Sequence, residues 1–261
     1  MAENLIVEKR NGVATVTLNR PEVRNAFDDE LISALTLAMG ELERDSSVRV
    51  VVLAGAGSAF CAGADLNWMK RMAGYDTEQN VADARALADM LAALDRLPQP
   101  TIARVHGPAF AGGTGLVSAC DIALGTPEAK FCFSEAKLGL TPATISPYVI
   151  RAIGERAARR YFLSAEVFDA EEALRIGLLS HLVPAAELDS ALEALLGHLL
   201  AGAAHGRIKD LIRDVAHRPI DAALRAETAR RIADARASAE GKEGVASFLE
   251  KRKPAWLPPK K

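Results

Sequence analysis

The sequence predicts an α/β fold, in which crossover helices join the strands of a mostly parallel sheet. A continuous run of mainly β-branched residues at 48–54 is typical of a strand that is buried on both faces. Amphipathic helical segments flank this run along the chain, and such alternation of strands and helices indicates crossover connections. After about residue 187 the remaining patterns are all helical.

The first elements are a hairpin and a helix. Residues 5–10 and 13–19 alternate apolar and polar side chains, and Asn11-Gly12 between them is typical of a two-residue hairpin turn. The next segment, 28–44, places its apolar side chains at the spacing of one helical face. We therefore expect a hairpin followed by a helix that packs on the sheet.

The central part of the chain repeats strand, turn and helix. Pro98 and Pro100 end a second long amphipathic helix, because proline cannot continue a helical hydrogen-bond ladder. The expected elements are, in order, strand 48–54, helix 78–97, strand 101–105, a small-residue helix ending near Ala119 and strand 121–125.

The chain divides into two regions, a core at 1–186 and a helical region at 187–261. Alanine-rich helices that carry apolar stripes but have no sheet to cover often pack on another subunit. We therefore expect the second region to mediate self-association, although folding back on its own chain is the alternative. Its expected helices are 187–200, 207–215, 221–236 and 242–251.

The composition is that of an ordinary globular protein, with 49% hydrophobic and 25% charged residues. A net charge of −2 gives no reason to expect a nucleic-acid or anionic-membrane partner. No run of about 18 apolar residues indicates a membrane span, and the first residues do not resemble a signal peptide. The three cysteines lack disulfide or metal-ligand spacing. We expect a cytoplasmic protein with no metal site and no membrane association.

Two glycine-rich turns, at 55–65 and 107–115, each follow a strand and lead into a helix. Glycines at such turns leave backbone N–H groups free at the helix start, where they stabilise negative charge. Two converging N–H donors would form an oxyanion hole, although plain tight turns are the alternative. Neither turn matches a dinucleotide or Walker pattern, and Ser58 does not lie in a GxSxG motif.

Several motifs occur in an order that resembles the crotonase (enoyl-CoA hydratase/isomerase) family. This resemblance implies a spiral core of repeated ββα units and a C-terminal helical trimerisation region. Members often assemble as a trimer or a dimer of trimers. The motifs are Leu18-Asn19-Arg20-Pro21 with Asn25-Ala26, the run 60–66, the run 106–113, Cys120-Asp121-Ile122-Ala123 and the ending 248–254.

The resemblance further implies that the core binds an acyl-CoA thioester, with coenzyme A as part of the substrate and no separate cofactor. In this family two backbone N–H groups polarise the thioester carbonyl, and the matching residues here are Ala64 and Gly112. Residues at positions that border coenzyme A in the family are Arg24, Ala62, Asp65, Leu66, Phe248 and Lys251.

The resemblance assigns acid–base catalysis to Glu135, whose pKa apolar neighbours would raise toward the working pH. Family hydratases generally use a second glutamate, and the matching position here is Gly115. Three alternatives therefore remain open: a hydratase, a double-bond isomerase that uses Glu135 alone, and a CoA-binding protein with impaired catalysis.

The runs 64–70 and 146–149 are similar to bacterial family members that hydrate methylglutaconyl-CoA in leucine breakdown. We therefore expect a hydratase for a branched 2-enoyl-CoA. Because that acyl group carries a free carboxylate, Lys70 and Arg71 are candidate partners for it. The acyl pocket would include Trp68 and Met69, for which core packing is the alternative.

Overall fold

The structure is a computed structural model that describes residues 4–257. The chain forms two compact units, one up to Leu195 and one from Leu196 onwards. Within the described residues, every helix is too short or too polar to cross a membrane.

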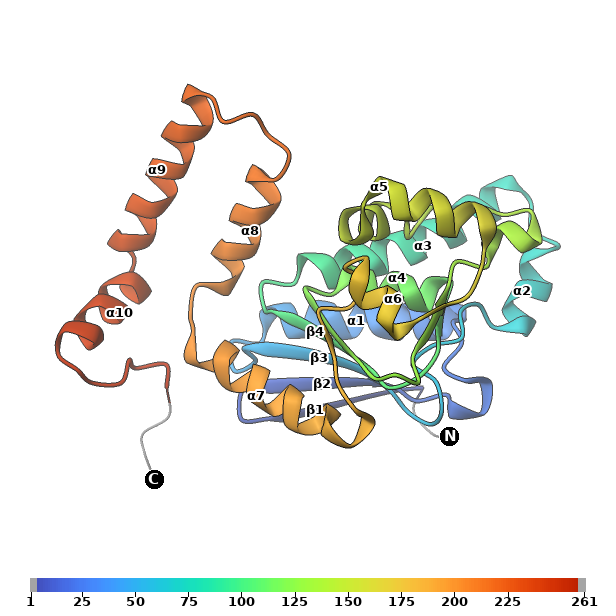
Figure 1. Cartoon of the computed structure of the whole chain (residues 1–261), viewed down its shortest axis with the longest axis horizontal. Helices are drawn as coiled ribbons and strands as arrows, with labels where there is room; N and C mark the ends of the chain where they lie inside the picture. Colours follow the sequence, from blue (N-terminus) through green and yellow to red (C-terminus); the bar gives the residue numbers. More distant parts are fainter. Residues whose placement is uncertain (1–3, 258–261) are drawn as a thin grey trace. The chain divides into compact units, whose positions relative to one another are not determined.

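The first unit is built on a six-stranded sheet, in which β1 to β4 lie side by side (Figure 1). Strand β1 is antiparallel to β2, and all other neighbours in this sheet are parallel. The order is β1 (Leu5–Arg10), β2 (Val13–Leu18), β3 (Val50–Gly55), β4 (Thr101–Val105), β6 (Ile122–Gly125) and β9 (His181–Leu182). The expected hairpin and parallel sheet are confirmed.

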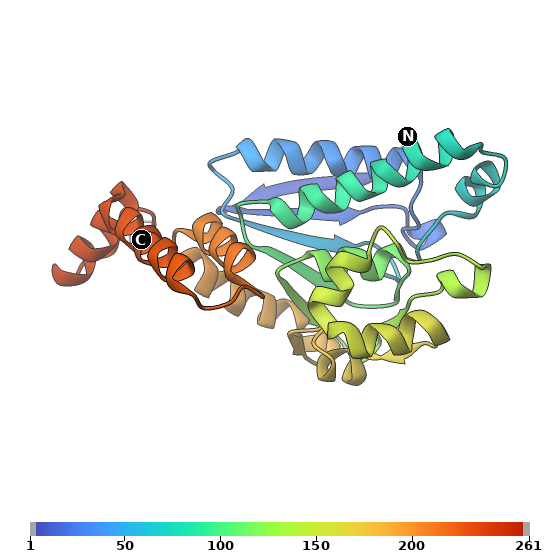
Figure 2. The same cartoon turned by 90° about the horizontal axis from the view of Figure 1, so that it is seen from above.

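Two long helices, α1 (Asp29–Arg44) and α3 (Thr77–Arg96), run alongside each other over the strands (Figure 2). The Asp28 side chain caps α1, and Asp76 forms a reciprocal capping box at the start of α3. Both helices start and end within one or two residues of the sequence prediction. They bury apolar faces in the same core as the sheet.

A second, three-stranded sheet was not predicted. Strand β5 is parallel to β7, and β7 is antiparallel to β8. These strands are β5 (Ala109–Phe110), β7 (Lys130–Cys132) and β8 (Phe168–Asp169). The other helices up to residue 201 are α2 (Leu66–Met72), α4 (Gly112–Ala119), α5 (Ser146–Ser164), α6 (Ala170–Arg175) and α7 (Leu188–Ala201), which extends from the first unit into the second. Short 3-10 helices span Pro21–Val23, Glu135–Leu138 and Ala185–Glu187.

The second unit contains α8 (His205–Val215), α9 (Ala222–Ala237) and α10 (Ala239–Leu249). Ion pairs link its helices, among them Arg231 of α9 with Asp214 of α8. Many of its large apolar side chains nevertheless remain exposed within the chain. They are Ile208, Ile212, Ile220, Ile232, Val245, Phe248 and Leu249.

Candidate active site

The two glycine-rich turns pack directly against each other. The Phe110 N–H donates to the Cys61 carbonyl oxygen at 2.9 Å, and the Phe60 N–H donates to that of Pro108 at 3.0 Å. A Cβ atom on Gly113 would lie 2.4 Å from the Cys61 carbonyl oxygen. Only glycine permits this approach, which brings residues 60–64 next to residues 109–113.

The backbone of Phe27 holds the first turn on both sides of Ala64. The Phe27 N–H donates to the Gly63 carbonyl at 2.6 Å, and the Asp65 N–H donates to the Phe27 carbonyl at 2.7 Å. Phe27 and Ala64 form a parallel β-bridge, in which the N–H and carbonyl groups of Ala64 point away from Phe27. Among the described residues, the Ala64 N–H has no hydrogen-bond partner.

The second turn presents Gly112 as the first residue of α4, where a backbone N–H has no partner within the helix. A Cβ atom on Gly112 would lie 2.8 Å from the Phe27 ring, so the same residue packs against both turns. The preceding Ala111 has φ 47° and ψ −118°, a strained conformation for a residue with a side chain. The Ala111 N–H is tied to the Cys132 carbonyl at 2.7 Å.

Glu135 follows the second sheet on the strand next to this turn. Strands β5 and β7 are parallel, so the residues after Phe110 and those after Cys132 leave the sheet at the same edge. Gly112 and Glu135 are each within three residues of that edge. The topology therefore brings the expected carboxylate to the side of the sheet where the Gly112 N–H lies.

The Glu135 carboxyl group is partly desolvated, and one of its oxygens is unpaired within residues 4–257. Burial raises its pKa above the ordinary value, only partly opposed by its own backbone N–H. Its Oε2 atom is buried and has no hydrogen-bond partner among the described residues. An uncommitted, partly desolvated carboxyl group of this kind can hold a water molecule and exchange a proton with it.

Gly115 leaves no room for a second carboxylate. A Cβ atom at this position would lie 2.2 Å from Cγ2 and 2.9 Å from Cβ of Ile145, which is 1% exposed. The space that a side chain at 115 would enter is therefore filled by Ile145, at the start of α5. The sequence shows that position 115 is a glycine, but only the structure shows that Ile145 fills the space that a larger residue there would need.

Other expected site residues have side chains with structural partners. Asp65 caps α2 and pairs with Arg20 at 3.1 Å. The buried Trp68 donates its indole N–H to Asp83 at 3.0 Å, so its ring belongs to the core. Met69 on the same helix is half-buried.

The remaining expected residues of the first unit lie around the first turn. The Ala62 N–H donates to the carbonyl of Arg24 at 2.9 Å, which joins the two segments expected to border coenzyme A. Leu66 is 73% exposed at the start of α2. On the same helix, Lys70 is exposed, and Arg71 forms an ion pair with Asp29.

Phe248 and Lys251 lie in the second unit, at the end of α10 and just beyond it. The Phe248 side chain is 81% exposed. Their expected contact with coenzyme A stays a prediction.

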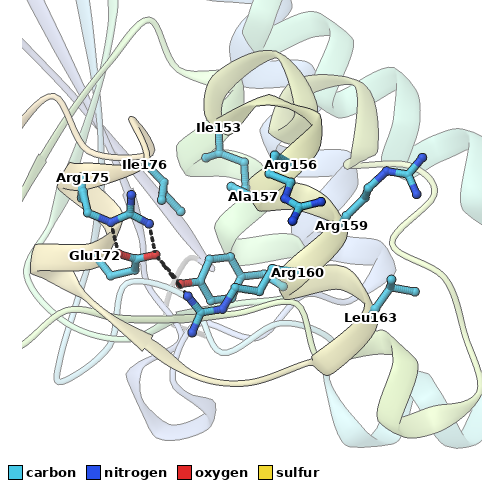
Figure 3. A pocket seen from close by; sticks show the side chains of 10 residues that line it. Ile153, Arg156, Ala157, Arg159, Arg160, Leu163, Glu172, Arg175 and Ile176 are labelled. Carbon is cyan, nitrogen blue, oxygen red and sulfur yellow. Dashed lines mark hydrogen bonds and ion pairs between the residues drawn. The ribbon is translucent and has the colours of Figure 1, made fainter.

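A cavity of about 750 Å³ between α5 and α6 contains none of the expected site residues. Figure 3 shows the arginines around it and Glu172, which accepts hydrogen bonds from Arg175. It is lined by Ile153, Arg156, Ala157, Arg159, Arg160, Tyr161, Leu163, Glu172, Arg175 and Ile176. Within residues 4–257, no group of three or more His, Cys, Asp or Glu side chains is placed to hold a metal ion.

Comparison with known proteins decides the family. A family model described as enoyl-CoA hydratase/isomerase matches residues 8–258. The chain belongs to this enoyl-CoA hydratase/isomerase family. A solved enoyl-CoA hydratase structure from Shewanella pealeana is 42% identical, with a TM-score of 0.95 over 97% of this chain and 96% of that one. The crotonase fold expected from the motifs is thereby confirmed.

Named relatives in the enoyl-CoA hydratase/isomerase family include a hydratase and an isomerase. A short-chain-enoyl-CoA hydratase from Clostridium acetobutylicum is 33% identical over 258 residues, which is 96% of each chain. A 1,2-epoxyphenylacetyl-CoA isomerase from Escherichia coli is 33% identical over 260 residues, covering 98% of this chain and 99% of the relative.

Proposed function

We propose that the protein is an enoyl-CoA hydratase that adds water to a branched 2-enoyl-CoA of the methylglutaconyl type. Family membership and a full-length hydratase relative support the reaction class. The observation that carries the proposal is the Glu135 carboxyl group, which is partly desolvated and unpaired at Oε2 among the described residues, on a residue that follows the strand paired with β5.

The backbone donors polarise the substrate. The thioester oxygen accepts hydrogen bonds from the N–H groups of Ala64 and Gly112, which strengthen as negative charge develops on it. This draws electrons from the double bond and makes C3 electrophilic. The donors are held by backbone packing, so they need no rearrangement during the reaction.

The single carboxylate then moves the proton. Glu135 accepts a proton from water as the water oxygen forms its bond to C3, which leaves an enolate at the thioester. The same carboxyl group returns the proton to C2 as the enolate collapses. Water is thus added without a second acid, consistent with a site in which Ile145 occupies the space beside Gly115.

We assign the substrate contacts from the exposure and existing partners of the candidate residues. Arg71 is already paired with Asp29, so we assign the acyl carboxylate to the exposed Lys70. Coenzyme A is assigned to the backbone around Ala62 and to Arg24, with Asp65 acting through its cap of α2. Leu66 and Met69 complete the proposed substrate surface of the first unit, whereas Trp68 supports α2 from the core. Phe248 and Lys251 of the second unit are proposed separately to contact coenzyme A.

A panel of straight, branched and carboxylated enoyl-CoA thioesters tests this assignment with the wild-type protein and the Glu135→Gln and Lys70→Ala variants. We expect the carboxylated branched substrate to react best and Lys70→Ala to raise KM for it alone. Arg71→Ala is the matched control on the same helix. Equal rates for carboxylated and uncharged branched substrates would contradict the role of Lys70.

Double-bond isomerisation is the second candidate, because one carboxylate suffices to shuttle a proton between carbons. The Gly115–Ile145 contact supports it, and the 1,2-epoxyphenylacetyl-CoA isomerase relative supports isomerisation only as a general reaction class. A shifted alkene with no added oxygen would identify this activity. A CoA-binding protein without turnover would instead give the same rates, at background level, for wild type and Glu135→Gln.

A further inference from the structure

Arg20 lies in the first motif of the chain but has no role in the chemistry described above. Its side chain is only 14% exposed. It pairs with Asp28 at 2.9 Å and with Asp65 at 3.1 Å, and it donates to the Ala26 carbonyl oxygen at 2.6 Å. One rigid, multiply donating group therefore joins two carboxylates and one backbone carbonyl oxygen.

Both carboxylates that contact Arg20 cap helices. Asp28 accepts from the Leu31 N–H at 2.8 Å and fixes the start of α1. Asp65 accepts from the backbone N–H groups of Asn67 and Trp68, at 2.8 and 3.2 Å, and fixes the start of α2. The guanidinium group thus ties the first turn of α2 to the first turn of α1.

The charge state of this connection is stable. Burial would raise the pKa of Asp65, but hydrogen bonds from the α2 backbone and the charge of Arg20 outweigh this, so its pKa is lowered. Asp65 stays ionised at neutral pH, and the ion pair persists.

The backbone next to Arg20 supports the same turn. The Arg20 N–H donates to Oδ1 of Asn25 at 2.9 Å. The Asn25 amide nitrogen in turn donates to the carbonyl oxygens of Ala56 and Ala59 at 2.8 and 2.9 Å. Asn25 is fully buried, so loss of these bonds would leave polar groups unpaired in the core.

These contacts converge on Ala64. Asp65, one of the two carboxylates that Arg20 bridges, is the next residue after Ala64. Phe27, which precedes the other carboxylate, Asp28, holds the backbone on both sides of Ala64. We infer that Arg20 is a positioning residue, which sets the direction of the Ala64 N–H toward the thioester oxygen. This inference rests on the proposed function, because it assigns Arg20 to the same oxyanion hole.

The experiment compares Arg20→Gln and Arg20→Lys with the wild-type protein. Arg104→Gln is the control, since Arg104 is a partly buried arginine that pairs with Asp189 in the same unit. Each variant is assayed for kcat and KM with an enoyl-CoA. The carbonyl stretch of a bound saturated acyl-CoA is measured by difference infrared spectroscopy, which requires no turnover.

We expect Arg20→Gln to lower kcat about 100-fold with KM changed less than about threefold, and to reduce the carbonyl shift. Arg20→Lys retains the charge and should recover part of the kcat and part of the carbonyl shift. This variant keeps the inference testable if Arg20→Gln fails to fold. Arg104→Gln should leave both unchanged. A full carbonyl shift and wild-type kcat in folded Arg20→Gln would overturn the inference. No shift in the wild-type protein would instead overturn the proposed function, and this inference with it.

Discussion

At the scale of single residues, Glu135 combines a catalytic advantage with a cost to stability. Its carboxyl group has a raised pKa because burial disfavours the charged form. The folded chain therefore binds this proton more tightly than the unfolded chain does. The contribution of this carboxyl group to the free energy of unfolding is fully present at low pH and is lost as the pH rises through the folded-state pKa.

The first prediction concerns Glu135→Gln. We expect turnover to fall about 1,000-fold, because the glutamine amide cannot accept the proton from water. In the wild type, kcat/KM should decline as the pH falls through the raised pKa.

The Glu135→Gln variant should melt at a higher temperature than wild type at pH 7, and this gain in melting temperature should shrink at pH 4. Thermal unfolding at both pH values checks it; a gain that grows toward pH 4 would contradict the sign.

The second prediction tests the packing of Gly115. Gly115→Ala should lower the free energy of unfolding by about 1–3 kcal/mol, because the new Cβ meets Ile145. Ile145→Ala alone should cost about 2–5 kcal/mol by leaving a cavity. The double variant should be more stable than the sum of the two losses predicts. Urea unfolding of the four proteins measures this coupling; strict additivity would show that the two side-chain sites do not compete for space.

At the scale of elements, the turn into α4 stores backbone strain where Gly112 must be held. Ala111 has a positive φ and is anchored to Cys132, next to the sheet edge that also leads to Glu135. Strained residues of this kind persist where the surrounding structure fixes them.

The third prediction compares two alanine-to-glycine changes. Ala111→Gly should raise the free energy of unfolding by about 1 kcal/mol, because glycine adopts this conformation without strain. Ala84→Gly, on the exposed face of α3, should lower it by about 0.5–1 kcal/mol. Chemical unfolding of both variants gives the comparison. A loss of stability in Ala111→Gly as large as in Ala84→Gly would argue against strain at the turn.

The elements that the sequence predicted well are those with long, regular patterns. The hairpin, α1 and α3 each repeat an apolar spacing over several residues. Strands β5, β8 and β9 have only two residues each, too few to show any alternation. Helix α5 contains Gly154 at φ 75°, a kink that interrupts its helical pattern.

The candidate site was predictable in part for a similar reason. Each turn is a short continuous run of residues, so a local motif could indicate it, and the family resemblance assigned Glu135. The contacts of Ile145 with Gly115 and of Arg20 with Asp65 join segments 30 or more residues apart, and no local pattern reveals them.

At the scale of the whole molecule, the second unit leaves many of its large apolar side chains exposed. The sequence predicted self-association of this region from its apolar stripes. Exposed patches of this kind mark interfaces between subunits. We propose a trimer or a dimer of trimers, because this is the assembly that the resemblance to the crotonase family implies.

The fourth prediction therefore concerns assembly. Light scattering should give a mass that is three or six times that of the chain. Ile232→Asp in α9 should shift the protein toward smaller species, because it places a charge on this exposed apolar surface. Leu37→Asp, at an exposed position of α1, is the control and should leave the mass unchanged. A monomeric wild-type protein would contradict the proposed assembly.

The most direct test of the central claim is the origin of oxygen in the product. The wild-type protein is incubated with a branched 2-enoyl-CoA in ¹⁸O-labelled water, and the product is analysed by mass spectrometry. The account predicts a 3-hydroxyacyl-CoA that carries one solvent oxygen, formed by the wild type and about 1,000-fold more slowly by Glu135→Gln. A rearranged alkene without solvent oxygen, or equal rates for the two proteins, would contradict it.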